Sequence, residues 1–375
     1  ILDTPISSRG NLGRILIGKS DVSGETLSPQ EVVFNNSFLT VSNDSVERSK
    51  ASETEINAGN ISIDAVNSIF FIRDSRISTV TERRGNAGNL TVQSKNGVVS
   101  FDNSDIFSNV NAGGIGGAGD ITITAGSIFL TNGTQLQSGV KQTFDDFIQS
   151  EILGTGGNIT LNAGKNITLS GSSLNNKPSG IFTDVESNAI GIAGNIIITT
   201  NSLFLTDQAI LTSRSSGLGY AGNITVNADS INLDNNSKIE ALNTPPAGIS
   251  ITLSSGNIDL QISDNLILRD SDISTQASIN ANGGNIDITA DAVIAFDDSD
   301  IFAFAADGKG GNITLDTPAY FAENFTLNSL TSNPDNLDNN SRADLNATGA
   351  VLGAVSIPDV SFIQNGLNNL PDNSI

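Results

Sequence analysis

The stretch Ala118–Ser138, AGDITITAGSIFLTNGTQLQS, contains three short runs separated by small or turn-forming residues. In the first two runs, Asp120–Thr124 and Ser127–Leu130, apolar residues alternate with polar ones, and a third run covers Gln135–Ser138. Alternation with a period of two, interrupted by Gly and Asn, is typical of half-buried β-strands rather than of helices. We therefore expect three strands in this stretch.

The same stretch recurs along the chain. A six-residue pattern occurs nine times, at intervals of 27 to 38 residues. Its positions are, in order, a small residue, then Gly, then Asn or Asp, then Ile or Leu, then any residue, then an aliphatic residue. A second block, a polar turn between two strand-like runs, follows most of these anchors. A period of roughly 30 residues indicates a solenoid, propeller or array. The anchor positions are Asn60, Asn89, Asp120, Asn158, Asn195, Asn223, Asn257, Asn285 and Asn312.

The repeat lacks the marks of the other repeat architectures. No coil supplies the helical return of a leucine-rich repeat, the chain has no Trp for a Trp-Asp propeller, and the apolar spacing is not that of a helix. A single coil cannot bury its own apolar row, whereas coils stacked about 4.8 Å apart can. We predict an all-β fold, a right-handed parallel β-helix of about ten rungs with roughly three short strands each.

The anchor segment also predicts local geometry. In a strand such as Gly-Asn-Ile-Thr-Ile, the two Ile side chains are expected to point inward and the Thr outward. The Gly before each anchor is expected to supply a positive φ at the corner.

The pattern divides the chain into three parts. Residues 1–57 lack the Gly-Asn anchor and are predicted to form degenerate first rungs. Residues 58–320 are predicted to form the regular β-helix, and residues 321–375 a degenerate last rung with an extended C-terminal tail. Because the chain begins with Ile1 and contains no Met, we expect it to be a processed or excised piece of a longer protein.

Within the two ends, a few segments still resemble strands. Arg14–Ile17 and Glu31–Val41 are predicted as strands, and Gly353–Ile357 as a last, degenerate anchor strand. Ser332–Asn346, rich in Asn and Asp, is predicted as loop.

Composition excludes several functions. The net charge of -22, from 18 Lys+Arg against 40 Asp+Glu, repels phosphate backbones and anionic lipid, so we expect no nucleic-acid partner. No apolar run is long enough for membrane insertion. Since the chain has no His and no Cys, it lacks imidazole bases, thiolates and the usual zinc ligands. We expect no cofactor and no metal.

Two glycine-rich stretches match a dinucleotide-binding motif, Gly114–Gly119 and Gly217–Gly222. A Rossmann site needs a helix directly after the glycines, and both stretches run into a repeat strand instead. We therefore interpret these glycines as corner residues.

Acidic residues recur at the corner between the second and third strand of the repeat. Paired carboxylates can hydrolyse glycosides or hold calcium, which leaves open a polysaccharide-degrading enzyme. Asp also favours tight turns, and equivalent coils carry Asn or Gly at this corner, so we prefer a structural role and predict no enzyme activity. The acidic groups are Asp102/Asp105, Asp270/Asp272 and Asp297/Asp298/Asp300.

Two consecutive coils carry long insertions, Gly139–Thr155 and Asn175–Ile192. Insertions at equivalent positions of a solenoid emerge from one edge and often form its binding face. The alternatives are that they are tolerated surface loops, and that Gly180–Val185 is simply the displaced third strand. The candidate binding residues are Lys141, Phe144, Asp145, Asp146, Phe147, Lys177, Phe182, Asp184 and Glu186.

The Gly-Asn-Ile-Thr-Ile anchors, the Leu-x-(Asp/Asn)-x-Ser-x-Ile-(Ser/Thr) lines and the ending Val355–Ile375 form a recognisable set. This set resembles the filamentous-haemagglutinin-like exoproteins of two-partner secretion, particularly the cyanobacterial type, over residues 58–375. The family's N-terminal secretion domain has no counterpart in these residues. The resemblance implies export through an outer-membrane transporter and a secreted or cell-surface location associated with the outer membrane.

From these observations we expect a non-catalytic, adhesin-type rod that binds glycan or cell-surface partners through the loops at one edge. The alternatives are the polysaccharide-degrading β-helix enzyme and a passive spacer that holds another domain away from the membrane.

Overall fold

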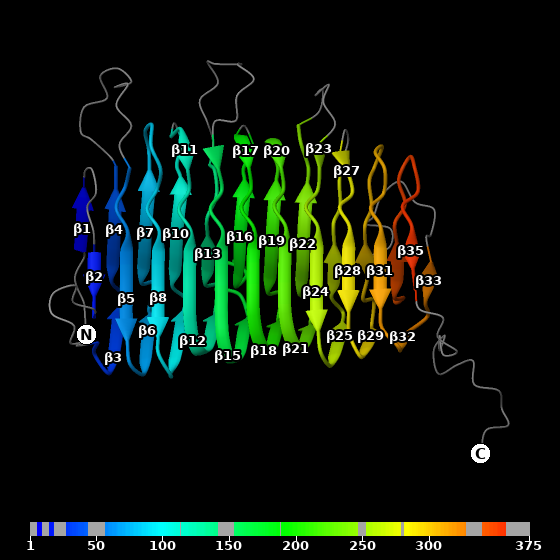
Figure 1. Cartoon of the computed structure of the whole chain (residues 1–375), viewed down its shortest axis with the longest axis horizontal. Helices are drawn as coiled ribbons and strands as arrows, with labels where there is room; N and C mark the ends of the chain where they lie inside the picture. The colour runs from blue at the N-terminus through cyan, green and yellow to red at the C-terminus, as the bar shows by residue number, and fades with distance from the viewer. Residues whose placement is uncertain are drawn as a thin grey trace.

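The computed structural model describes residues 6–9, 15–18, 28–43, 57–112, 114–141, 154–187, 189–246, 253–278, 281–327 and 340–357. Within these residues every regular element is a β-strand, and there is no helix. Figure 1 shows the strands side by side along the long axis of a rod, from β1 at one end to β33 and β35 at the other. Each strand pairs in parallel with its equivalents in neighbouring coils. The predicted parallel β-helix is confirmed.

The first ladder is made of the strands that follow the anchors. Its inward residues are Ile, Leu or Val in nearly every coil, so the strand is held to one register by its apolar side. In order, the ladder consists of β2 (Ile15–Ile17), β5 (Ile61–Ala65), β8 (Leu90–Ser94), β12 (Ile121–Thr131), β15 (Ile159–Ser170), β18 (Ile196–Thr206), β21 (Ile224–Asp234), β24 (Ile258–Ile262), β28 (Ile286–Thr289), β31 (Ile313–Asp316) and β35 (Val355–Ser356).

The second ladder includes the C-terminal halves of the four long strands β12, β15, β18 and β21. The first two runs predicted in Ala118–Ser138 are therefore one strand, β12, in which only the register shifts, between Ala125 and Ser127. The other members are β3 (Glu31–Asn35), β6 (Ser68–Ile72), β9 (Val98–Asp102), β25 (Asn265–Arg269), β29 (Ala292–Phe296) and β32 (Tyr320–Ala322).

The third ladder runs the whole length of the rod. In order, it consists of β1 (Ile6–Arg9), β4 (Phe38–Ser42), β7 (Arg76–Thr81), β10 (Asp105–Val110), β13 (Gln135–Gln137), β16 (Gly180–Val185), β19 (Ile210–Ser215), β22 (Lys238–Asn243), β26 (Asp272–Ser274), β30 (Ile301–Phe302), β34 (Asp344–Asn346) and β33 (Thr326–Leu327).

A short fourth ladder closes the middle coils and was not predicted. It links the third ladder back to the next anchor. Its strands are β11 (Gly116–Gly117), β14 (Gly154–Thr155), β17 (Ile190–Ile192) and β20 (Leu218–Tyr220), and a separate pair is formed by β23 (Leu253–Ser254) and β27 (Ala281–Asn282). The two glycine-rich stretches supply β11 and β20, so no dinucleotide-binding helix follows either of them.

One apolar core fills the rod from end to end. In β12, Ile121 and Ile123 are fully buried while Thr122 between them is partly exposed, as predicted for the repeat strand. Near the N-terminal end the core contains a stack of phenylalanines, in which Phe71 lies 4.5 Å from Phe34 and 4.3 Å from Phe101 between ring centroids. Each coil thus hides its apolar row only through its neighbours.

In addition to the strand ladders, the anchor residues form a polar ladder along the outside of the rod, which we call the amide ladder. The side-chain Oδ1 of each anchor accepts a hydrogen bond from the backbone N–H of the next anchor, at 2.8–3.0 Å, from Asn60 to Asn312. Asp120 serves equally well because only an acceptor oxygen is used. The ladder ends where Asn312 Oδ1 accepts the N–H of Ala354 at 3.0 Å.

The glycine before each anchor has a different role from the one predicted. Gly157 and Gly194 are not among the residues with a positive φ, so that prediction was wrong. A Cβ at Gly194 would lie 2.0 Å from the carbonyl oxygen of Gly157, and a Cβ at Gly157 would lie 2.3 Å from that of Gly119. Glycine is required because consecutive coils bring their backbones into direct contact at this corner.

Buried hydroxyl groups hold the same corner from inside. Ser138 of the third ladder donates a hydrogen bond to the carbonyl oxygen of Gly119 at 2.9 Å and accepts one from the N–H of Gly157 at 3.0 Å. Ser108 and Ser213 make equivalent pairs of bonds in their own coils. The corner is therefore fixed by an amide ladder outside and a hydroxyl column inside.

The ends follow the predictions in part. Glu31–Val41 is not one strand, because a corner at Asn36, with φ 48°, separates β3 from β4. The predicted last anchor strand is confirmed as β35, which pairs with β31. The predicted loop Ser332–Asn346 is wrong at its end, where Asp344–Asn346 forms β34 between β30 and β33; residues 332–339 lie outside the described residues.

Candidate functional site

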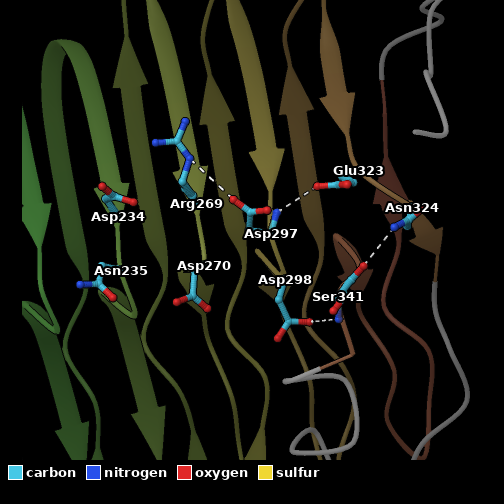
Figure 2. A pocket seen from close by; sticks show the side chains of 9 residues that line it. All are labelled: Asp234, Asn235, Arg269, Asp270, Asp297, Asp298, Glu323, Asn324 and Ser341. Atoms are coloured by element: carbon cyan, nitrogen blue, oxygen red, sulfur yellow. Dashed lines mark hydrogen bonds and ion pairs between the residues drawn. The ribbon is translucent and has the colours of Figure 1, made fainter. Parts of the chain in front are cut away.

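A groove lies where the second ladder turns into the third, near the C-terminal end of the rod (Figure 2). Two residues at or just after the end of each of β21, β25, β29 and β32 line it, together with Ser341. We call it the acidic groove. It is lined by Asp234, Asn235, Arg269, Asp270, Asp297, Asp298, Glu323, Asn324 and Ser341.

The backbone explains why acidic residues gather there. Asn235, Asp270, Asp297 and Asp298 all have φ between 48° and 62°, in the left-handed region. Asn and Asp tolerate this conformation better than other residues with a Cβ. The groove is thus lined with carboxylates because the corner selects this residue type.

Several of the groove carboxylates are engaged in bonds with the protein itself. Asp298 Oδ1 accepts the backbone N–H groups of Asn340 at 2.7 Å and Ser341 at 2.6 Å, and so holds the last coil (Figure 2). Asp297 Oδ2 lies 3.7 Å from Arg269 Nε, and both side chains are more than half exposed. Over the described ranges, no three or more Asp or Glu side chains are placed to hold a metal ion.

The acidic pair Asp102/Asp105 is divided between two ladders. Asp102, at the end of β9, accepts a bond from Asn132 Nδ2 at 2.6 Å. Asp105, at the start of β10, instead faces outward on the third ladder and binds Lys177 Nζ at 2.7 Å. The corner therefore separates the two carboxylates of a pair, and each has a neighbour of its own.

A row of carboxylates on the third ladder lies behind the acidic groove. The register places Asp272, Asp300 and Asp344 at equivalent positions in three consecutive coils. Asp272 binds Lys238 Nζ at 2.7 Å. Asp300 is 0% exposed; its Oδ1 accepts the N–H of Asp344 at 2.8 Å, and its Oδ2 has no hydrogen-bond partner.

Burial raises the pKa of Asp300 to about 9, and the neighbouring carboxylates Asp272 and Asp344 add to the effect. Burial likewise raises the pKa of Asp344. A carboxyl group that keeps its proton at neutral pH is the type of group that acts as a general acid. Because Asp300 has no exposed surface, however, no substrate reaches it in this structure.

Parts of both predicted insertions belong to the coil. Gly154–Thr155 forms β14, Gly180–Val185 forms β16 and Ile190–Ile192 forms β17. Phe182 and Asp184 are therefore strand residues, and Gly180–Val185 is the displaced third strand, which was the alternative to a projecting loop. The interpretation of 175–192 as a projecting loop does not hold for β16 and β17. Four predicted binding residues, Phe144, Asp145, Asp146 and Phe147, lie outside the described residues.

The structure does bring three of the predicted binding residues together. Lys141 Nζ lies 2.6 Å from Glu186 Oε1. Asp184 Oδ2 lies 3.2 Å from Arg214 Nη2, and burial raises the pKa of Asp184 although Arg214 and Lys141 oppose this. We call Lys141, Asp184, Glu186 and Arg214 the ionic cluster. Lys177 does not join it but binds Asp105.

Sequence reasoning missed Arg214 of this cluster and Asp344 of the carboxylate row. The signal that reveals both is the register of the third ladder, which aligns Asp184 with Arg214 and places Asp300 opposite Asp344. The sequence alone does not give this register, because the lengths of the insertions between the coils must be known first.

Comparison with known proteins identifies no relative. No protein-family model, curated protein or solved structure matches this chain. Within the part of the chain that the structure describes, no helix has the length and hydropathy needed to cross a membrane.

Proposed function

We propose that this protein is a non-catalytic, adhesin-type β-helix rod, secreted or displayed at the cell surface, that binds glycan or cell-surface partners. The observation that carries the proposal is the use made of the polar residues. Asp298 holds the last coil, the anchors join successive coils, and the buried serines fix the corners. The polar side chains of the repeat thus serve to build a long, regular surface.

The sequence resemblance supports the route by which the rod reaches that surface. An outer-membrane transporter of the two-partner-secretion type is the partner that it implies. Protease digestion of intact producing cells tests the location: a surface protein is degraded while a periplasmic control protein stays intact. Protection of the rod in intact cells, together with its absence from the medium, refutes it.

Attachment is tested with the whole protein on a glycan array and on whole cells. Because β16 and β17 belong to the coil, removal of residues 175–192 would disrupt the fold, so point changes replace deletion. Lys141→Ala and Lys177→Ala remove the two predicted binding lysines, and Lys95→Ala, at an exposed bend, is the matched control. A loss with Lys141→Ala or Lys177→Ala, but not with Lys95→Ala, supports binding at the end of the third ladder where that lysine lies.

If the three lysine variants attach as the unchanged protein does, the two predicted lysines are not part of the binding site. If the unchanged protein attaches to no glycan and no cell, the adhesin proposal fails and a passive spacer remains.

A second candidate, a polysaccharide-degrading enzyme, is favoured by one observation. The acidic groove places Arg269 in a pocket that is also lined by several carboxylates, with Asp297 Oδ2 3.7 Å from Arg269 Nε. Incubation with a panel of polysaccharides, followed by measurement of reducing ends, separates the two functions. Release that is lost in Asp297→Asn, but not in Asp287→Asn on an exposed strand position, would favour the enzyme.

A further inference from the structure

The outward face of the second ladder carries an apolar row that the sequence analysis did not identify. The inward neighbours of this row, such as Ile128 and Leu130 around Phe129, are fully buried, so the row itself points to solvent. Phe321 at its end is 37% exposed. We call it the phenylalanine row. From one end of the rod to the other it consists of Val33, Phe70, Ser100, Phe129, Thr168, Phe204, Asn232, Ile267, Ile294 and Phe321.

The aromatic rings in the middle of the row have a regular spacing. Phe70, Phe129 and Phe204 occupy every second coil, with Ser100 and Thr168 between them. Since coils are about 4.8 Å apart, the rings repeat roughly every 10 Å along the rod. Aromatic rings at a constant repeat, separated by hydroxyl groups, match a ligand that itself repeats and has both apolar faces and polar edges.

Hydroxyl and amide groups flank the phenylalanine row on both sides. On one side the register aligns Ser127, Asn166, Ser202 and Ser230, among which Ser127 Oγ donates to Asn166 Oδ1 at 2.8 Å. The other side carries Thr131, Ser170 and Thr206 in consecutive coils. Ser127 is buried, whereas the other side chains are partly exposed and offer donors and acceptors in line with the rings.

The charge of this face limits what it can bind. The four long strands in the middle of the row contain three charged residues, Lys165, Asp229 and Asp234. The chain as a whole has a net charge of -22. A second copy, an anionic polysaccharide or an anionic membrane would each be repelled by that charge, whereas an uncharged ligand is not.

We infer that the phenylalanine row is a binding track for a neutral, extended β-linked polysaccharide that lies along the rod. Sugar rings stack on Phe70, Phe129 and Phe204 through their apolar faces, and the flanking Ser, Thr and Asn side chains bond to the hydroxyl edges. This inference rests on the proposed function and names its ligand class and its site, which is distinct from the ionic cluster.

The test uses the double variant Phe129→Ser with Phe204→Ser. The row already carries Ser100 and Thr168 at equivalent positions, so the fold accepts such residues there. Ile197→Thr is the matched control, because Ile197 is 37% exposed on the first ladder between Thr160 and Thr225. Affinity gel electrophoresis measures binding to hydroxyethyl cellulose, a neutral glucan, and to alginate, an anionic polysaccharide.

We expect the unchanged protein and Ile197→Thr to bind hydroxyethyl cellulose equally. We expect the affinity of the double variant to be lower by a factor of roughly ten or more. Circular dichroism checks that the double variant is folded; if it is not, Phe129→Thr alone takes its place. Alginate is expected to bind weakly or not at all.

Three results would overturn the inference. The first is undiminished glucan binding by the double variant, which leaves the proposed function intact if the protein still attaches on the array. The second is absent glucan binding, or stronger alginate binding, by the unchanged protein. The third is a dimer in analytical ultracentrifugation that the double variant dissociates, since the row would then be an interface between copies.

Discussion

Replacement of Asp300 by Asn tests the carboxylate row of the third ladder. Asp300 is fully buried opposite Asp344, and burial raises its pKa to about 9 from 3.8. At neutral pH the folded protein therefore holds a proton that the unfolded chain releases. Asn keeps the carbonyl oxygen that accepts the N–H of Asp344 and cannot ionise.

The direction of the pH dependence of stability follows from the linkage between proton binding and folding. Because the folded pKa lies above the unfolded value, the stability that this group contributes is complete below about pH 4 and is lost as the pH rises towards 9. At about 1.4 kcal/mol for each pH unit, the loss between the unfolded pKa and pH 7.5 is at most about 5 kcal/mol. We expect Asp300→Asn to be more stable than the unchanged protein by a few kcal/mol at pH 7.5, and nearly equal at pH 4.

The assay is urea unfolding followed by circular dichroism at several pH values between 4 and 9. Asp287→Asn, which removes the same charge from an exposed strand position, controls for the effect of net charge. If the difference between Asp300→Asn and the unchanged protein does not grow with pH, or equals that of Asp287→Asn, then Asp300 is not a buried, protonated carboxyl group.

Three further substitutions test the elements that hold the coils together, each by urea unfolding. Asn158→Ala removes the acceptor for the N–H of Asn195 and should cost about 1 kcal/mol, whereas Asn158→Asp should cost little, and equal losses would contradict the acceptor role. Gly194→Ala should destabilise by more than about 3 kcal/mol, because its Cβ would meet a backbone oxygen at 2.0 Å, while Gly164→Ala, with open space around it, should not. Phe71→Ala leaves a cavity in the aromatic stack and should cost about 3–5 kcal/mol; a loss below about 1 kcal/mol would mean that the stack does not pack as described.

The anchor pattern was enough to predict the fold because it repeats one local rule. Alternation placed Ile121 and Ile123 inward correctly, and the preference of Asp for turns correctly located Asp270 at a corner. Both predictions depend on a few adjacent residues. The prediction of a positive φ for the glycine before each anchor was wrong for a physical reason. A glycine is needed either for a positive φ or for a close backbone contact, and the sequence alone does not distinguish the two.

The sites were harder to predict because they depend on register between distant coils. Phe129 and Phe204 are 75 residues apart, and two insertions of different length lie between them. Only the pairing of β12, β15 and β18 places them in one row. The same holds for Asp300 and Asp344, which are 44 residues apart, so neither row could be counted from the anchor spacing.

The outer amide ladder makes the coil a unit that can be gained or lost. The backbone N–H of each anchor donates to the anchor of the preceding coil, and its side-chain oxygen accepts from the anchor of the next coil. The same hydrogen bond therefore joins every pair of consecutive anchors. Excision of residues 195–222 would bring the N–H of Asn223 to Asn158 Oδ1, with Ile224 taking the place of Ile196 against Ile159. Recombination between repeats can therefore change the length of this rod in whole-coil steps while keeping the same kind of hydrogen bond at the anchor corner.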